Sequence, residues 1–145
     1  MVLQRWQSVF LLLAAILMGI YTFSPIATVT VAEAENEVSM LGTGAEGGAY
    51  MWGLFGVSAL TALLALVTIF KFKTLKLQRR LCIICGGITA ALIVSLMILL
   101  FNLDCDSISL KMTNVLPIVA ILLFYLADMG ISKDIKILSS YDRIR

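Results

Sequence analysis

The stretch MWGLFGVSALTALLALVTIFKFKTLKLQRRLCIICGGITAALIVSLMILLF, residues 51–101, decides the fold. Two apolar runs, at 51–70 and 81–101, flank the segment 71–80, in which five residues are Lys or Arg. Each run has the roughly 20 residues that an α-helix needs to cross the hydrocarbon core of a bilayer. The stretch is therefore predicted to form two membrane-spanning helices joined by a short basic loop.

Two further apolar runs lie on either side of this pair. The first span is predicted at about 8–29, with Pro25 near its end, and the fourth at 113–131. The chain is 61% hydrophobic and 14% charged, whereas soluble domains are about 45–50% apolar and about 25% charged. We therefore expect an all-α membrane protein, a single domain over residues 1–145 that forms a four-helix antiparallel transmembrane bundle.

The first apolar run has an alternative interpretation. Arg5, the apolar stretch and the triplet Ala32-Glu33-Ala34 together imitate a secretory signal peptide with its cleavage site. The apolar region of a signal peptide is about 7–15 residues long, whereas this run carries no charge from Ser8 to Ala32. A permanent span is therefore the favoured interpretation.

The positions of Lys and Arg predict the orientation of the spans. Ten of the 11 basic residues lie before the first span, in the loop 71–80 or in the tail 132–145, and only Lys111 lies elsewhere. Because cytoplasmic segments carry the excess of basic residues, both termini and the loop 71–80 are predicted to be cytoplasmic. The outer loops are then 30–50, which holds four glutamates, and 102–112. These glutamates could attract a divalent cation, but they lack the alternating oxygen ligands of a calcium loop.

Small residues predict how the spans pack, because helices in lipid associate where their backbones approach closely. The third span has the clearest stripe, with Gly87, Ala91 and Ser95 at intervals of four residues. We expect the third span to pack on the first and second spans and the fourth to lie more peripherally. The alternative is that such a stripe serves a partner protein.

Cys82 and Cys85 form a C-x-x-C pair at the predicted cytoplasmic mouth of the third span, directly after Arg79 and Arg80. A helix N-terminus and neighbouring arginines stabilise a thiolate, so one hypothesis is a membrane thiol-disulfide oxidoreductase. Against it, the pair faces the reducing cytosol, and only Cys105 lies on the outer side. Buried structural cysteines are the favoured interpretation.

The absence of histidine excludes several classes of site. Haem held by His, zinc held by His and Cys, and Ser/His or Cys/His catalysis all need a residue that the chain lacks. Three thiols on opposite sides of a membrane cannot supply the four ligands of a structural zinc site. The net charge of +2 gives no indication of nucleic-acid binding. No cofactor and no metal site is predicted.

Asp128 is the only charged residue within the four predicted spans, and an ionisable residue there is a functional candidate. It lies about one turn from the cytoplasmic end, where its carboxylate could pair with Lys133, Arg79 or Arg80. A structural ion pair is favoured over a proton or ion relay. The relay remains the basis of a second alternative, a small transporter.

The tail KDIKILSSYDRIR, residues 133–145, is predicted to form a short amphipathic cytoplasmic helix. It would lie on the inner leaflet or under the bundle, with Asp134 and Asp142 within reach of the loop 71–80. Each Lys or Arg near an anionic leaflet contributes about 1 kcal/mol of binding, so the basic face is predicted to contact lipid. The apolar face of the tail comprises Ile137, Leu138, Tyr141 and Ile144.

Both ends of the chain carry a recognisable pattern. LQRWQSVFLLLAAILMG at 3–19 and ISKDIKILSSYDRIR at 131–145, bracketing four spans, resemble an uncharacterised family of small four-span inner-membrane proteins of Bacteroidota, a domain-of-unknown-function family. Ile135 and Ser139 depart from the acid and the arginine of that pattern. The resemblance implies this topology and a bacterial inner membrane, but no activity, cofactor or catalytic residue. The matching positions are Gln4, Arg5, Gln7, Ser8, Lys133, Asp134, Leu138, Ser140, Asp142, Arg143 and Arg145.

The leading functional hypothesis is a non-enzymatic membrane protein, an accessory or assembly subunit of a bacterial inner membrane. Its partners would be anionic lipids at the basic face, together with a membrane protein or a second copy of the chain. The alternatives are the oxidoreductase, using Cys82 and Cys85, and the transporter, using Asp128. The candidate functional residues are Cys82, Cys85, Asp128, Arg79, Arg80, Asp142, Arg143 and Arg145.

Overall fold

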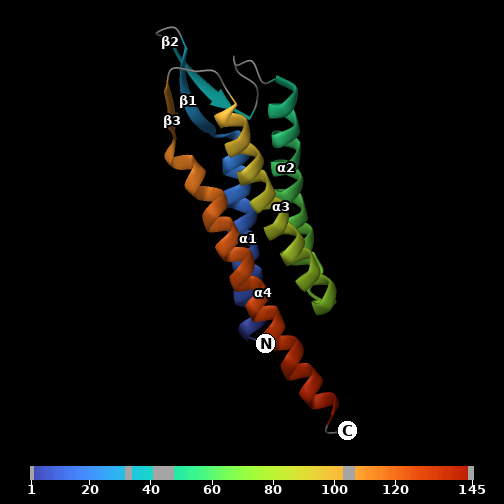
Figure 1. The fold of residues 1–145 in the computed structure, drawn as a ribbon. Coiled ribbons are helices and arrows are strands. Elements are labelled where there is room, and N and C mark those ends of the chain that lie inside the picture. The colour runs from blue at the N-terminus through green and yellow to red at the C-terminus, as the bar shows by residue number, and fades with distance from the viewer. Residues whose placement is uncertain (1, 32–33, 41–47, 103–106, 144–145) are drawn as a thin grey trace.

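The computed structural model describes residues 2–31, 34–40, 48–102 and 107–143. Within them, four long helices form an up-and-down bundle with a three-stranded sheet at one end and both chain ends at the other (Figure 1). The protein is mostly helical, as predicted, and the small sheet corrects the expectation of an all-α fold. In chain order the elements are α1 (Val2–Phe23), β1 (Pro25–Val31), β2 (Ala34–Ser39), α2 (Gly48–Phe70), α3 (Leu75–Phe101), β3 (Ser107–Leu110), the 3₁₀ helix η1 (Met112–Asn114) and α4 (Val115–Asp142).

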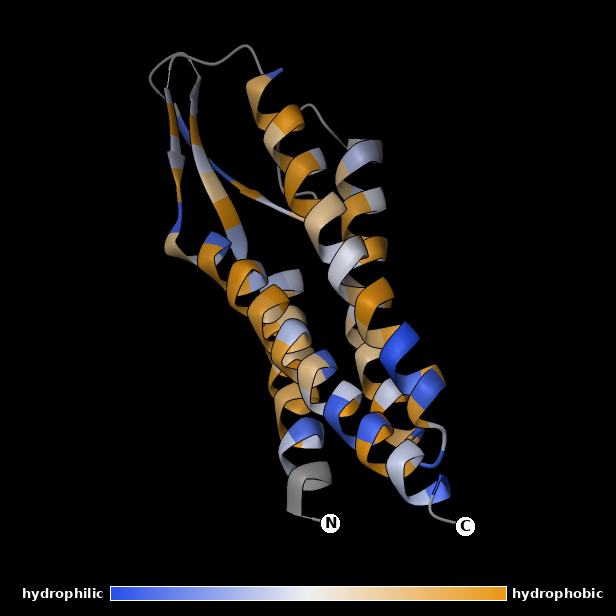
Figure 2. Cartoon of the chain, turned by 60° about the horizontal axis from the view of Figure 1, so that its bottom comes forward, coloured by the Kyte–Doolittle hydropathy of each residue, from blue (hydrophilic) through white to orange (hydrophobic). Residues whose placement is uncertain are grey.

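Each of the four helices is long and apolar enough to cross a membrane. Hydrophobic residues run along the helices, while hydrophilic residues gather near the chain ends (Figure 2). Apolar side chains therefore cover the outside of the bundle as well as its core. Examples of exposed apolar residues, one from each helix, are Leu13, Leu63, Ile98 and Leu122.

Helix α1 is displaced relative to the predicted first span. The span is predicted over 8–29, but α1 begins at Val2 and ends at Phe23. Pro25 has no backbone N–H to continue a helix, and it biases the residue before it toward extended conformations. The residues that follow, IATVTV, are rich in β-branched side chains, which favour strands. Hydropathy alone does not distinguish an apolar strand from a helix, so the helix prediction extended into β1.

The basic loop predicted at 71–80 is largely helical. Helix α3 begins at Leu75, so the turn between α2 and α3 comprises only residues 71–74. Lys76, Arg79 and Arg80 lie in the first two turns of α3. Lys and Arg are good helix formers, and their long side chains reach water while their aliphatic stems lie on the bundle. Charge therefore marks the end of the apolar run here but does not mark the end of the helix.

The C-terminal tail is not a separate helix. Helix α4 runs without interruption from Val115 to Asp142 and extends past the rest of the bundle (Figure 1). Beyond its first turn α4 has no proline and only one glycine, Gly130, so nothing in the sequence ends the helix earlier. The predicted helix at 132–145 thus forms, as far as Asp142, but as the continuation of the fourth helix.

The helices pack in a ring that differs from the predicted order. Helix α1 packs against α2 and α4, and α3 packs against the same two helices. The expectation that the third span packs on the first and that the fourth is peripheral is therefore wrong. The stripe of Gly87 and Ala91 on α3 faces outward, whereas α4 presents a buried row at spacings of three and four residues. That row comprises Pro117, Ala120, Phe124, Ala127 and Ile131.

The sheet has the order β2-β1-β3, and both pairings are antiparallel. Its apolar face packs on the end of the bundle, where Val29 and Val38 are buried against Met51, Leu54 and Leu99. The opposite face is polar, because side chains alternate along a strand. This face carries Thr28, Thr30, Glu35, Glu37, Ser107 and Ser109. Part of the predicted outer loop 30–50 is therefore strand rather than loop.

Hydrogen bonds tie η1 and the residue before it to the first residues of β1. The backbone N–H of Lys111 donates to the carbonyl of Ile26 at 3.0 Å. The Asn114 amide donates to the same carbonyl at 2.9 Å, and the Thr113 hydroxyl donates to the Pro25 carbonyl at 2.7 Å. Residues far apart in sequence thus fix the point where the chain changes from helix to strand.

Candidate functional site

An ion pair joins α3 to α4 near the end of the bundle that carries the chain ends. Arg79 Nε donates to Asp128 Oδ1 at 3.2 Å. Both side chains retain some exposure to solvent, the arginine more than the aspartate. Of the three basic partners considered for Asp128, the structure therefore pairs it with Arg79. The pair ties α3 to α4 through a charge-assisted hydrogen bond.

A second polar tie joins α1 to α4, six residues further along the same helix. Gln7 is buried, and its Nε2 donates to Asp134 Oδ2 at 2.7 Å. Gly130 makes room for this side chain, because a Cβ at position 130 would lie 2.8 Å from Gln7 Cγ. Asp134 is predicted to reach the basic loop, but in the structure its carboxylate accepts a hydrogen bond from Gln7. In sequence, Gln7 stands out only as part of the N-terminal family pattern, and Gly130 carries no signal.

Cys82 and Cys85 face the interior between α3 and its neighbours. They are 1% and 0% exposed, and both are free thiols. Thr68 of α2 lies beside Cys85, and Cys85 and Asp128 lie near Cys82. Because α3 starts at Leu75, Cys82 lies about two turns inside the helix. The predicted position at a helix N-terminus is therefore wrong, and the macrodipole effect is confined to the first turn.

Sequence reasoning missed a polar stripe on α3. Gln78, Cys82, Cys85 and Thr89 are all buried on one face, at spacings of four, three and four residues. Gln78 Oε1 and Gln7 Oε1 are buried acceptors without a hydrogen-bond partner among the described residues. The helical spacing of polar residues within an apolar span is the signal that could have revealed this stripe.

The core-facing side of α2 also carries hydroxyl groups, at Ser58, Thr61 and Thr68. Thr61 and Thr68 donate to the carbonyls four residues earlier, and the Ser58 hydroxyl lies 2.7 Å from that of Thr22 on α1. These local bonds satisfy the hydroxyl donors within the bundle. They account for the polar residues of α2 as packing groups and form no connected relay toward Asp128.

A comparison with known protein families identifies the domain. The family described as Domain of unknown function (DUF4293) matches residues 3–144. The chain belongs to this DUF4293 family. The expected resemblance to a domain-of-unknown-function family is thereby confirmed. Neither the curated proteins nor the solved structures gave a match.

The DUF4293 match includes both polar ties, since it extends from the first turn of α1 to the end of α4. Arg79, Cys82, Cys85 and Asp128 lie together at one end of this domain. We define the Arg79–Asp128 and Gln7–Asp134 contacts as the α4 clamp. Among the residues with a described position, no group of three or more Cys, Asp or Glu side chains could hold a metal ion.

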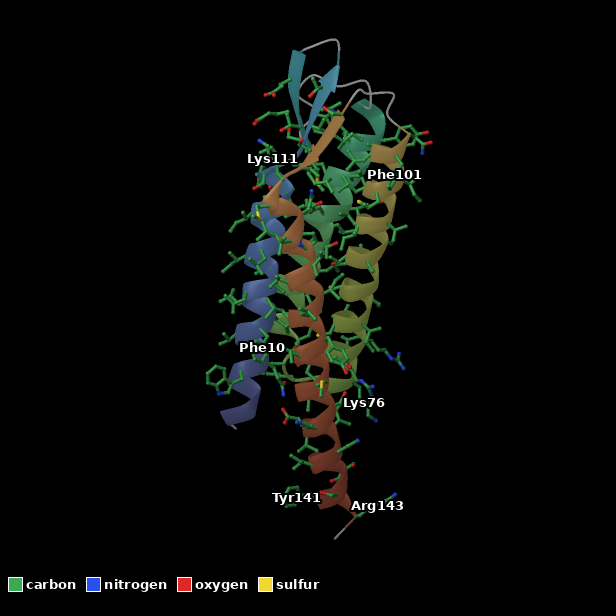
Figure 3. The ribbon with its side chains drawn as sticks, turned by 60° about the vertical axis from the view of Figure 1, so that its left-hand side comes forward. Phe10, Lys76, Phe101, Lys111, Tyr141 and Arg143 are labelled. Atoms are coloured by element: carbon green, nitrogen blue, oxygen red, sulfur yellow. The ribbon has the colours of Figure 1, made fainter. Side chains whose placement is uncertain are left out.

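The remaining candidates of this DUF4293 domain are not part of the clamp. Arg80 is exposed on α3, and Asp142 and Arg143 are exposed on the projecting end of α4. Figure 3 shows Tyr141 and Arg143 there, beyond the level of Lys76. Arg145 lies outside the described residues. The structure therefore places the described sequence candidates in two regions rather than in one site. Arg79, Arg80, Cys82, Cys85 and Asp128 lie on α3 and the facing part of α4, and Asp142 and Arg143 lie on the projecting end of α4.

Proposed function

We propose that the protein is a multi-pass protein of a bacterial inner membrane that acts as a non-enzymatic accessory subunit. Its basic end faces the cytoplasm, where the projecting end of α4 binds a partner protein. The outward faces of all four helices support a membrane location, because apolar side chains there would be unfavourable in water.

The distribution of charge supports the orientation. One end of the bundle carries eight of the described basic residues: Lys71, Lys73, Lys76, Arg79, Arg80, Lys133, Lys136 and Arg143. Lys111 is at the sheet end (Figure 3) and forms an ion pair with Glu37. By the positive-inside rule the end with the termini is cytoplasmic. The basic residues around the α2–α3 turn would then contact the anionic leaflet.

The length of α4 is the observation that carries the proposal. Its 28 residues give a helix of about 42 Å, against about 30 Å for the hydrocarbon core of a bilayer. The last turns therefore extend past the hydrocarbon, where Ile137, Leu138 and Tyr141 are exposed. A partner helix with an apolar face would cover these side chains, and acidic residues beside that face would complement Lys133 and Lys136.

The test is site-specific photocrosslinking in native membranes. A crosslinker at Tyr141 should give a discrete protein adduct, whereas the same crosslinker at Ile118, on the lipid-exposed side of α4, should give lipid adducts. The Tyr141 adduct should disappear when Ile137→Ser and Leu138→Ser are combined, because both residues are exposed and the fold does not depend on them. Lipid adducts alone at Tyr141 would contradict the docking of a protein.

A further inference from the structure

Among the described residues, no strand pairs with the outer edge of β3. Ala27 lies opposite Leu110, and Val29 lies opposite Ile108. The Lys111 N–H donates to Ile26, so Lys111 belongs to the set of residues whose backbone groups point toward β1. Backbone direction alternates along a strand. The N–H and C=O groups of Ile108 and Leu110 therefore point away from β1, and no described strand lies on that side.

The β2 and β3 edges of the sheet differ in how well they are protected against the addition of another strand. By the same alternation, the outward backbone groups of β2 belong to Glu35 and Glu37, and charged side chains on an edge strand oppose the addition of further strands. β3 has the sequence SISL, without charge or proline, and all four residues are exposed. Of the two edges of the described sheet, only the β3 edge therefore lacks charged side chains that oppose another strand.

The side chains of β3 extend an apolar face that the bundle does not cover. Ile108 and Leu110 lie on the same face as Val29, yet they are 37% and 54% exposed. Met112, which begins η1 directly after the strand, is also exposed. A strand added beside β3 would place every second side chain on this face, so an alternating apolar and polar segment fits it.

The charge of the sheet end also indicates which kind of peptide segment fits the β3 edge. The described part of this end carries two acidic residues, Glu35 and Glu37, and one basic residue, Lys111. In sequence, the segments 24–50 and 102–114 together contain six acidic residues and this one lysine. Lys111 is already paired with Glu37. A segment with Lys or Arg beside its apolar residues therefore complements this end, whereas an acidic segment is repelled.

A second copy of the chain does not fit the edge. β3 descends from the sheet end toward α4 in both views (Figures 1 and 3). Two copies that share one orientation in a membrane run this strand the same way along the membrane normal, so they cannot pair antiparallel. A symmetric parallel pair would set N–H groups against N–H groups.

We infer that the β3 edge binds an extended, basic segment of a separate protein, which adds a fourth strand to the sheet. This partner lies on the side of the membrane opposite the one that binds the end of α4. The two interactions use different ends of the protein, so either can fail without the other.

The test uses a defined fluorescent peptide, Lys-Lys-Val-Thr-Val-Thr-Val-Lys, and the full chain in lipid nanodiscs. Anisotropy should show binding that falls at least tenfold when the pairing amides of the peptide are N-methylated, and when Glu replaces its three lysines. Leu110→Pro should cause a similar loss, because it removes an outward N–H and no bond to β1. Protein-free nanodiscs measure adsorption to lipid.

Hydrogen exchange supplies a readout that does not depend on a variant. The Ile108 and Leu110 amides should exchange fast in the free protein and slowly with the peptide bound, while the Ser109 amide, which faces β1, should be protected throughout. No binding of any peptide, or equal binding of the N-methylated peptide, would overturn the inference. So would exchange at Ile108 and Leu110 that the peptide leaves unchanged.

Discussion

The absence of a side chain at Gly130 lets α4 pack closely against Gln7 of α1. Gly130→Ala should lower the free energy of unfolding by about 1–3 kcal/mol, because the new Cβ would overlap the buried Gln7 side chain. Denaturant unfolding in detergent measures this loss. In a Gln7→Ala background the clashing atoms are gone, so the further cost of Gly130→Ala should nearly vanish. Equal costs in both backgrounds would show that the contact with Gln7 is not the cause.

The two cysteines of α3 are inaccessible in the folded protein. Alkylation of Cys82 and Cys85 by a maleimide should be slower than in the unfolded chain by on the order of 100-fold or more, because reaction requires local opening. Mass spectrometry of the labelled peptides measures both rates. Fast labelling of the native protein, or a disulfide that forms and breaks in cells, would restore the oxidoreductase hypothesis.

Asp128 offers a test of the ion pair against the relay. Asp128→Asn should cost about 0–1 kcal/mol of stability, as partly exposed ion pairs do, and it should leave membrane proton flux unchanged. A double-mutant cycle with Arg79→Gln isolates the coupling between the two side chains. Zero coupling would mean that the pair contributes nothing to the bundle, and a lost flux would favour the transporter.

At the scale of elements, the start of β1, directly after α1, is held by side chains of the 3₁₀ helix η1. Thr113→Val and Asn114→Ala should each remove one hydrogen bond to the Pro25 or Ile26 carbonyl, at a cost of about 1 kcal/mol. Hydrogen exchange should become faster at Thr28 and Thr30 of β1, while amides near Cys85 stay protected. Uniform change over the whole chain would instead indicate global loss of stability.

The number and the approximate place of the helices could be predicted from hydropathy, but their ends could not. The length and the apolar composition of a segment can be read from the local sequence alone, and each of α1, α2, α3 and α4 is a long apolar segment. The end of α1 depends on strand pairing between Ala27 and residues of β2 and β3, which no local window contains. The start of α3 lies within a charged segment that hydropathy counts as loop.

The candidate site was only partly predictable for the same reason. Asp128, Arg79 and the cysteines stand out by residue type, but the partner of Asp134 comes from α1, more than a hundred positions away in sequence. The small-residue stripe of Gly87 and Ala91 misled the packing prediction, because small residues permit close approach without requiring it. The ring order of the helices follows from the buried rows of all four helices together.

At the scale of the whole molecule, the orientation predicts which ends are accessible from each side. In a background with Cys82→Ala, Cys85→Ala and Cys105→Ala, Ser140→Cys should be labelled by an impermeant maleimide only in inverted vesicles. Glu35→Cys, at the sheet end, should be labelled only in right-side-out preparations. Both substituted residues are exposed, so neither should disturb the fold. Labelling of both from one side would contradict the proposed topology.

The unbroken course of α4 connects the sheet end of the bundle to the end that carries the chain termini. β3 and η1 lead directly into its first residue, and its last turns extend freely beyond the bundle. The α4 clamp contacts the helix at Asp128, near its middle, and at Asp134, about two turns before its end. A strand bound to β3 and a helix bound to the last turns of α4 would therefore contact opposite ends of one continuous path, β3–η1–α4.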